Sequence, residues 1–289
     1  MLSNQIATSN IKMKTYQQLW QSLTPLYDAG EAQAIVRTVL DVKYGMTLTD
    51  IIGGKVNEIS ADEERKLEEI IIRLQKGEPV QYVLGEADFA GRPFHVEPGV
   101  LIPRPETAEL CQWIEKDMIE KSIVSSGDSS GNSPQATDDA KLILDICTGS
   151  GCIAITLGLN IPNSEVTGWD ISEDALRIAQ GNVEMMKAGN VRIEHQDALA
   201  LPKAAETDNE KMKGNDDKEV VKPKGEAKTP STQKWDLIVS NPPYICEKEK
   251  ADMEKNVLEH EPSLALFVPD EDPLKFYRAI AEYASSALK

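Results

Sequence analysis

The sequence has few histidines, few cysteines, little aromatic content and no long hydrophobic run. Its 289 residues include three histidines and four cysteines, and aromatic residues make up 5%. No apolar stretch approaches the roughly 20 residues that a membrane-spanning helix needs. The polar residues 1–14 also lack the apolar core of a secretory signal. These absences argue against a membrane protein and predict a cytoplasmic one.

The few cysteines show no metal-binding spacing. Cys111, Cys147, Cys152 and Cys246 form no Cys-x-x-Cys pair, and no histidine stands beside them at ligand spacing. A metal site and a disulfide framework are therefore not expected, and buried, reduced thiols are the better interpretation.

The chain is also short of basic charge. Asp and Glu number 48 against 31 Lys and Arg, which gives a net charge of −17. Proteins that bind nucleic acid through its phosphates usually present a basic face, so direct nucleic-acid binding is not expected. The acidic excess favours solubility instead, and we expect a monomer.

The length allows two domains, and the first is helical. Residues 14–85 are predicted to form an N-terminal helical bundle, because Leu67, Ile70, Ile71 and Leu74 recur at helical spacing. Ser60-Ala-Asp-Glu63 has the pattern of a capping box that starts this helix.

Residues 86–102 are predicted to form a β-hairpin linker, because short β-like pieces are broken by Gly91-Arg-Pro93 and Pro98-Gly99. In residues 103–289, apolar strands alternate with helices. This alternation is typical of an α/β fold with a doubly wound parallel sheet, or Rossmann-like domain. The predicted strands are Leu142–Ile146, Val166–Trp169, Val191–Glu194 and Trp235–Ser240.

Two segments interrupt the alternation. Residues 122–139 are rich in Ser and Gly, and residues 203–233 have no aromatic residue and balance seven lysines against seven acids. Both are too polar to offset the entropy cost of ordering, so we predict disordered inserts.

A glycine-rich turn follows the first predicted strand, in Asp145-Ile-Cys147-Thr-Gly149-Ser-Gly151. Glycines there let the chain turn sharply and let a ligand approach the backbone. Gly149-x-Gly151-x-x-Ala154 with the later Asp170 also fits a dinucleotide fingerprint. The turn by itself leaves both cofactors open, as well as a plain strand–helix connection.

Acidic residues follow the next two strands. Asp170 can accept both hydroxyls of a ribose, although it can also cap the helix that begins near Ser172. Asp197 can accept from an adenine amino group, or it is a solvated loop residue.

The most specific motif is Ser240-Asn241-Pro242-Pro243-Tyr244, directly after the fourth strand. Neither proline can donate a ladder hydrogen bond, so the strand stops there. Pro243 also holds Pro242 in an extended conformation. The Pro242 carbonyl is thereby fixed and can face a pocket at the carboxyl edge of the sheet.

The residues of this motif are suited to binding a planar amide or amino nitrogen. The lone pair of an amide nitrogen is delocalised into its carbonyl and is a poor nucleophile. The Asn241 side-chain oxygen and the Pro242 carbonyl can accept its two N–H groups, which aims the nitrogen at a sulfonium methyl group and stabilises the growing positive charge. Tyr244 can lie against the flat group and exclude water. We therefore predict catalytic roles for these three residues without a metal.

Together the motifs resemble S-adenosylmethionine-dependent methyltransferases that act on exocyclic or amide nitrogens. More narrowly, the chain resembles the peptide chain release factor glutamine methyltransferases, which methylate N5 of the glutamine in the Gly-Gly-Gln loop of class 1 release factors. Arg104-Pro105-Glu106 favours this family over a relative that modifies a ribosomal protein. The narrower resemblance rests on Gly77-Glu-Pro-Val-Gln-Tyr-Val-Leu-Gly85, Leu101-Ile-Pro-Arg-Pro-Glu-Thr107 and Glu261-Pro-Ser-Leu-Ala-Leu-Phe267.

The resemblance implies a role for each motif. The helical domain would dock the release factor, and Cys147 would replace the first glycine of the turn, a change that we expect to be tolerated. The glutamine would be held by Asn241, Pro242, Pro243 and Tyr244. The cofactor S-adenosylmethionine would be contacted by Asp145, Thr148, Gly149, Gly151, Asp170, Asp197 and Asn241.

The resemblance also implies further strands beyond Lys289, so the methyltransferase domain is expected to be truncated at its C-terminus. Two alternatives remain. A DNA adenine-N6 methyltransferase would present the same residues to an adenine amino group, but it must flip a base. A truncated fragment could instead bind its partner without turnover.

Overall fold

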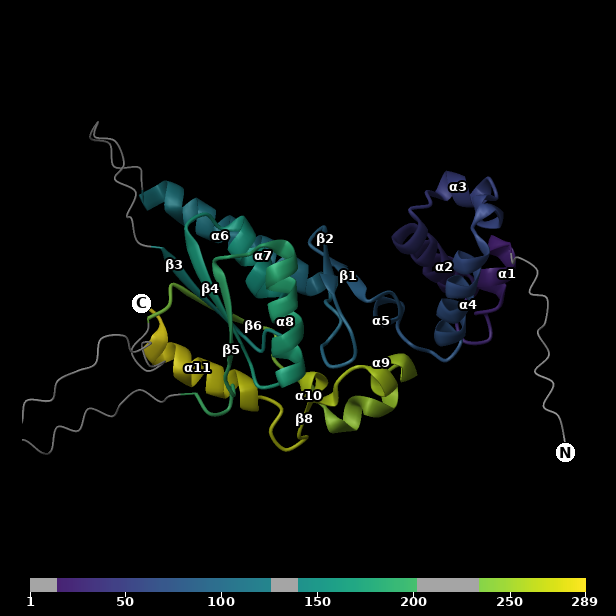
Figure 1. Cartoon of the computed structure of the whole chain (residues 1–289). Helices are drawn as coiled ribbons and strands as arrows, with labels where there is room; N and C mark the ends of the chain where they lie inside the picture. Colours follow the sequence, from purple (N-terminus) through teal and green to yellow (C-terminus); the bar gives the residue numbers. More distant parts are fainter. Residues whose placement is uncertain (1–14, 126–139, 202–233) are drawn as a thin grey trace, which may run out of the picture. The chain divides into compact units, whose positions relative to one another are not determined.

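The computed structural model describes residues 15–125, 140–201 and 234–289 (Figure 1). The predicted insert 203–233 lies outside these ranges, as does residue 126 onward of the predicted insert 122–139. Residues 122–125 belong to the end of a helix rather than to an insert. Within the described ranges, no helix is long and apolar enough to cross a membrane.

The chain divides into two compact units. The first is Met1–Gly85 with Glu254–His260, and the second is Glu86–Met253 with Glu261–Lys289. Each unit has its own buried hydrophobic cores.

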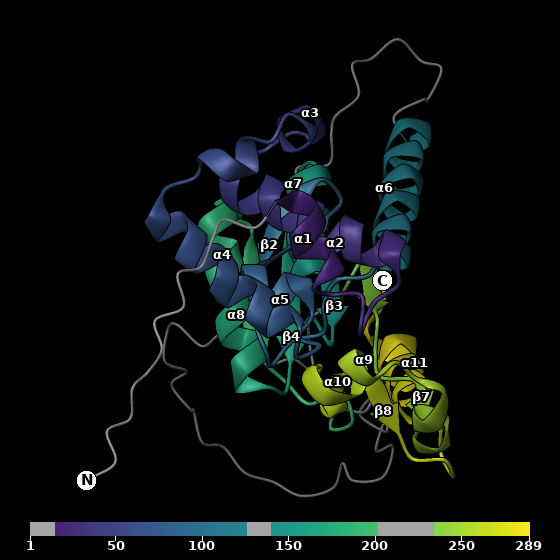
Figure 2. The same cartoon turned by 90° about the vertical axis from the view of Figure 1, so that its right-hand side faces the viewer.

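The first unit is helical (Figure 2). Buried apolar side chains of its helices and their connections form one core, which includes Leu23, Val36, Leu40, Ile71 and Leu74. Its elements are α1 (Tyr16–Gln21), α2 (Ala29–Tyr44), α3 (Leu48–Ile52), the 3-10 helix η1 (Lys55–Glu58), α4 (Ala61–Leu74), α5 (Val80–Leu84) and α9 (Lys255–His260).

Helix α4 begins at the predicted capping box. The Ser60 hydroxyl accepts from Glu63 N at 3.3 Å, and the Glu63 carboxylate accepts from Ser60 N at 2.8 Å. Two otherwise unpaired backbone donors are satisfied in this way.

Helix α9 joins this unit from far along the sequence. Burial raises the pKa of Glu31, and neighbouring carboxylates, among them that of Glu254, raise it further. The pKa of Glu78 is lowered mainly by the hydrogen bond from Arg73, and in smaller part by His260. Both ends of the returning segment therefore lie near charged residues of the N-terminal helices.

A hairpin opens the second unit. Strands β1 (Glu86–Phe89) and β2 (Arg92–His95) pair antiparallel across Ala90 and Gly91, whose φ angles are +52° and +75°. Two successive positive φ angles fit the twist of a two-residue hairpin turn. Phe89 and Phe94 meet edge to face with ring centroids 5.8 Å apart, which fixes the hairpin against the core.

Four parallel strands form the central sheet, in the order β5-β4-β3-β6. The predicted parallel, Rossmann-like sheet is therefore confirmed. The strands are β3 (Lys141–Ile146), β4 (Ser164–Asp170), β5 (Val191–His195) and β6 (Leu237–Ser240).

Helices cover both faces of the sheet (Figure 1). On one face, α6 (Pro105–Ser125), α7 (Cys152–Asn160) and α8 (Glu173–Met186) share a core with Ile143, Val166 and Val239. On the other face, α11 (Lys275–Ala287) packs through Phe276 and Tyr283 against Leu144, Ile146 and Trp169.

The remaining elements follow β6. Strand β7 (Ile245–Cys246) pairs in parallel with β8 (Phe267–Val268), and between them lie the 3-10 helix η2 (Glu247–Asp252) and α10 (Ser263–Leu266). After α11, Leu288 forms an isolated parallel bridge with Trp235, just ahead of β6.

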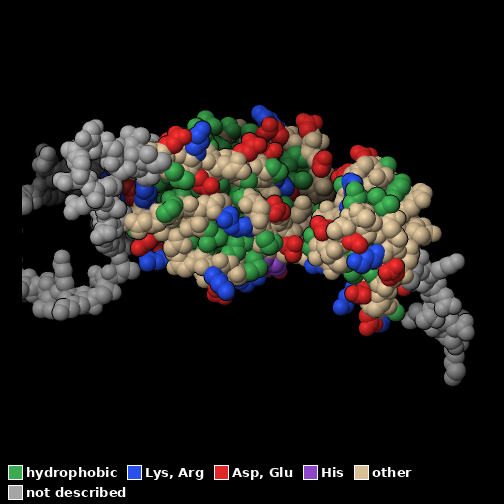
Figure 3. Space-filling model, turned by 90° about the horizontal axis from the view of Figure 1, so that it is seen from above, with side chains coloured by type: hydrophobic (Ala, Val, Ile, Leu, Met, Phe, Trp, Pro, Cys, Tyr) green, Lys and Arg blue, Asp and Glu red, His purple; other side chains and the backbone are tan. Residues whose placement is uncertain are grey.

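The surface carries mixed charge. On the face shown in Figure 3, acidic, basic and hydrophobic side chains of the described residues are interspersed, and acidic groups lie beside most of the basic ones. This distribution agrees with the excess of acidic residues in the sequence.

Candidate functional site

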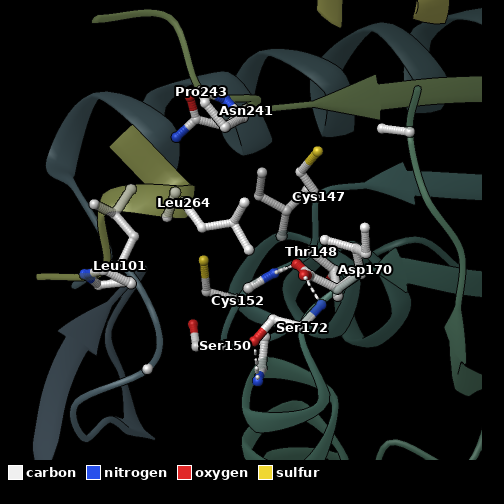
Figure 4. A pocket seen from close by; sticks show the side chains of 18 of the residues that line it. Leu101, Cys147, Thr148, Ser150, Cys152, Asp170, Ser172, Asn241, Pro243 and Leu264 are labelled. Carbon is white, nitrogen blue, oxygen red and sulfur yellow. Dashed lines mark hydrogen bonds between the residues drawn. The ribbon is translucent and has the colours of Figure 1, made fainter. Parts of the chain in front are cut away.

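The strand order defines where a ligand can bind. The chain adds β4 and then β5 on one side of β3, and it places β6 on the other side. Open parallel sheets bind ligands at such a switch point, outside the carboxyl ends of the strands. A pocket lies there, lined from all four strand ends by Cys147, Thr148, Gly149, Ser150, Asp170, Ile171, Ser172, Gln196, Asp197, Ala198, Asn241 and Pro243 (Figure 4).

The turn after β3 is shaped by left-handed backbone. Cys147, Gly149 and Gly151 have φ angles of +61°, +56° and +80°. A Cβ added at Gly149 would meet nothing within 4 Å, so glycine is favoured there by conformation rather than by lack of space. Thr148 N donates to Trp169 O at 2.9 Å, which ties the turn to β4.

Asp145 lies behind this turn and does not line the pocket. One carboxylate oxygen accepts from Thr148 Oγ1 at 2.6 Å and from Ala154 N at 3.2 Å. The other oxygen has no hydrogen-bond partner among the described residues. Burial raises the pKa of Asp145 to about 7, against the lowering effect of those hydrogen bonds. Asp145 thus links the turn to the start of α7.

Asp170, at the end of β4, does line the pocket. Its Oδ2 accepts from Gly149 N and its Oδ1 from Ser172 N, each at 2.9 Å. Each carboxylate oxygen keeps capacity for a further donor. The cap of α8 is Ser172, whose hydroxyl accepts from Ala175 N, so capping does not account for Asp170.

Gly151 and Asp197 differ in their position relative to the pocket. Gly151 caps α7 without lining the pocket, and a Cβ there would lie 3.3 Å from the Ala179 Cβ, so it allows α7 and α8 to pack closely. Asp197 lines the pocket, and its Oδ1 accepts from Leu199 N at 2.8 Å.

A buried asparagine supports the glycine-rich turn from α8. Asn182 is fully buried; its Oδ1 accepts from His95 N at 2.8 Å, and its Nδ2 donates to His95 O at 3.0 Å and to Ser150 O at 2.9 Å. One side chain therefore joins β2, α8 and the turn.

Only part of the Asn241–Tyr244 motif after β6 lines the pocket. Asn241 and Pro243 line the pocket, and they lie together at its edge in Figure 4. Asn241 Nδ2 donates to Thr107 Oγ1 at 3.3 Å, and the preceding Ser240 Oγ donates to Ile146 O at 2.6 Å. Pro242 and Tyr244 do not line the pocket: Pro242 is buried, and Tyr244 is 56% exposed.

Two further walls come from segments whose local sequence gave no signal for a pocket. One segment contributes Leu101, Pro103, Arg104 and Thr107, and the other contributes Pro262, Leu264 and Ala265. The buried Glu261 joins them, since its carboxylate accepts from Ile102 N at 3.1 Å and from Arg104 Nη2 at 2.6 Å. Gln196 and Phe276, which also line the pocket, were missed as well.

The two thiols that line the pocket, Cys147 and Cys152, are not nucleophiles at neutral pH. Burial raises the pKa of each to about 12, and the carboxylates of Asp170 and Asp145 raise that of Cys147 further. Neutral thiols leave the pocket without a covalent catalyst of this kind among the described residues.

The switch-point pocket, the glycine-rich turn and the strand-end acid are those of a Rossmann-like domain that binds a nucleoside-containing cofactor, and with the Asn-Pro-Pro-Tyr motif after β6 they fit the class of S-adenosylmethionine-dependent methyltransferases. Family models agree: residues 137–265 match "Methyltransferase domain", and residues 25–85 match "PrmC N-terminal domain". The chain belongs to the release factor glutamine methyltransferase family.

Curated relatives named release factor glutamine methyltransferase show that the chain belongs to this family. The Bacteroides thetaiotaomicron protein is 44% identical over 93% of this chain and 80% of its own length. The Flavobacterium psychrophilum protein is 34% identical over 96% of this chain and 82% of its own. The Bacillus subtilis protein is 34% identical over 93% of this chain and 80% of its own.

The pocket residues fit S-adenosylmethionine, the methyl donor of this family. Ser150 Oγ is buried in the lining beside the Cys152 thiol. Asp170 has capacity for ribose hydroxyls. Ile171, Ala198 and Leu264 supply apolar surface for a flat base.

Proposed function

We propose that the chain transfers a methyl group from S-adenosylmethionine to N5 of the glutamine in the Gly-Gly-Gln motif of class 1 peptide chain release factors. The observation that carries the proposal is the position of Asn241, in the pocket lining at the switch point between β3 and β6. The names of the curated relatives support the choice of substrate.

The cofactor supplies a methyl group on a sulfonium centre and leaves as a neutral thioether. Asp170 would accept the ribose hydroxyls and Asp197 the adenine amino group, next to the backbone of Thr148 and Gly149. Asp145 and Gly151 would act from behind, by holding the turn and the packing of α7.

Asn241 Oδ1 would accept one N–H group of the glutamine amide. The carbonyl of Pro242, a buried residue outside the pocket lining, would accept the other where the glutamine extends beyond the cofactor pocket. Two acceptors on one nitrogen orient it and stabilise the positive charge that develops as the new N–C bond forms. One N–H proton then leaves to solvent, which gives the neutral methylamide. Pro243 would shape the wall beside the glutamine.

Tyr244 and the first unit would contact the substrate outside the cofactor site. Tyr244 is exposed at the end of the motif, where an arriving glutamine can cover it and exclude water. The N-terminal helical bundle, predicted over residues 14–85, would dock the body of the release factor.

The test incubates the chain with methyl-labelled cofactor and a class 1 release factor, and maps the label by mass spectrometry. We expect it on the glutamine of Gly-Gly-Gln and expect none when that glutamine is replaced by alanine. A label on another residue would contradict the substrate assignment.

Asn241→Ala tests the proposed role of Asn241. It should lower kcat by about 10²–10³-fold, the usual effect of removing one preorganised group that stabilises transition-state charge. Cofactor affinity, measured by calorimetry, should stay within a few-fold. Near wild-type turnover in this variant would remove Asn241 from the mechanism.

A further inference from the structure

Asn241 is held by a residue of the pocket lining that comes from a different segment, the start of α6. Its Nδ2 donates to Thr107 Oγ1 at 3.3 Å, across 134 positions of sequence. Its Oδ1 has no partner within the described part of the chain. The two ends of the amide are therefore in different situations, one engaged and the other available to a ligand.

The backbone around Asn241 is already fixed, so the side chain is the mobile part. Ser240 on one side is tied to Ile146 O by its hydroxyl, and two prolines follow on the other side, which restricts the main chain. What remains free are the side-chain torsions, and the outer one is broad and roughly two-fold.

Thr107 is carried by a rigid element. It lies in the first turn of α6, where its N–H donates to Arg104 O at 3.0 Å. Further along α6, Cys111 and Met118 are buried in the core of the sheet. Ahead of the helix, Arg104 and Ile102 N are both bound by the buried Glu261.

We propose that Thr107 is the positioning residue of Asn241: its hydroxyl accepts from the Asn241 NH₂ group and restrains the side-chain torsions, which holds the amide where Oδ1 can meet the methyl-accepting nitrogen. This inference rests on the proposed function and assigns a role to the last residue of the Leu101–Thr107 segment. A displacement of the acceptor by about 1 Å is expected to slow transfer strongly, since reaction geometry is that sensitive.

The test compares Thr107→Val, which keeps the shape but removes the hydroxyl, with Thr107→Ser, which keeps the hydroxyl. We expect Thr107→Val to lower kcat for release factor methylation about tenfold, with KM and cofactor affinity within about twofold. Thr107→Ser should recover activity to within about threefold of wild type. Ser285→Ala is the matched control, because it removes an exposed hydroxyl that bonds only to its own helix.

A double variant separates positioning from a general structural effect. In the Asn241→Ala background, Thr107→Val should cause no further loss, because the group that it positions is gone. An additive loss, a large loss of cofactor affinity, or unchanged kcat in Thr107→Val would each overturn the proposal.

A nuclear magnetic resonance measurement tests the positioning of Asn241 without any substrate. The side-chain NH₂ signals of Asn241, assigned by their loss in Asn241→Ala, should shift or broaden in Thr107→Val and stay in place in Ser285→Ala, each variant made in the chain described here. Unchanged Asn241 signals would refute the positioning role even if the methylation assay succeeds. A shift without methylation of any release factor would refute only the proposed function.

Discussion

Cys147 adopts a backbone conformation that favours glycine. Its φ of +61° places a Cβ in the left-handed region, which costs about 1–2 kcal/mol for residues other than glycine. The thiol at this position is neutral, because burial raises its pKa to about 12.

We therefore predict that Cys147→Gly raises the free energy of unfolding by up to about 1 kcal/mol, because relief of strain exceeds the greater backbone entropy of glycine in the unfolded chain. Urea denaturation measures the change. A loss of more than about 1 kcal/mol would mean that packing of the thiol outweighs the strain.

Asp145 should make stability depend on pH. Its pKa in the folded protein is about 7, raised chiefly by burial from an ordinary value of 3.8. Because the folded pKa is the higher one, the contribution of this proton to stability is complete below about pH 4, declines as the unfolded chain releases its proton, and is lost once the pH has risen through 7.

The variant Asp145→Asn cannot lose that proton, and its amide oxygen can still accept from Thr148 and Ala154. Its free energy of unfolding relative to wild type should increase by a few kcal/mol between pH 4 and pH 8. Urea denaturation of both proteins at the two pH values checks this, and a constant difference would show that Asp145 is charged in the folded state. Cofactor affinity should change little, since Asp145 lies behind the turn.

At the scale of elements, Asn182 holds three of them together. Asn182→Ala removes three hydrogen bonds and leaves His95 N and Ser150 O without these partners. We predict a loss of about 2–4 kcal/mol in the free energy of unfolding, because three hydrogen bonds of a fully buried side chain are lost and the buried Ser150 O loses a donor.

The exposed Asn57, whose side chain donates to Gly54 O, offers the control: Asn57→Ala should cost less than about 1 kcal/mol. Equal effects of the two substitutions in thermal denaturation would mean that the Asn182 bonds contribute little.

The elements themselves could be predicted from the sequence, because strands, caps and turns leave local patterns. The capping box at Ser60, the hairpin and all four parallel strands follow from such patterns. The direction in which a side chain points at the end of a strand was harder to predict. Asp145 lies two residues after Ile143, on the face that packs under α7, and alternation along β3 therefore directs it behind the turn rather than into the pocket.

The walls of the pocket could not be predicted from local patterns. Arg104 and Leu264 contain no signal of their own, and they come together because Glu261 binds Ile102 N and the Arg104 side chain across more than 150 positions. Such long-range pairing depends on the folded sheet. From the sequence, these segments could be recognised only by their resemblance to the family.

At the scale of the molecule, the cofactor should stabilise one unit selectively. Every residue that lines the pocket belongs to the second unit, and the first unit has a separate core. Bound ligand stabilises the structure that binds it by about 2.7 kcal/mol at a concentration of 100 times Kd.

Amide exchange in α7 and α8 should therefore slow up to about 100-fold with saturating cofactor, while exchange in α2 and α4 changes little. Hydrogen exchange followed by mass spectrometry distinguishes the two regions. Equal protection of α2 and α4 would show that the units open as one.

The membership of Glu254–His260 in the first unit has a consequence for recombination. The backbone passes from one unit to the other three times, after residues 85, 253 and 260. A chimera that exchanges the helical bundle at a single junction would pair a foreign bundle with the original α9, and a fragment ending at Gly85 would lack that helix. Transplanting this unit between homologues requires two segments to be moved together, so its residues at 254–260 should co-evolve with the N-terminal helices rather than with their neighbours in sequence.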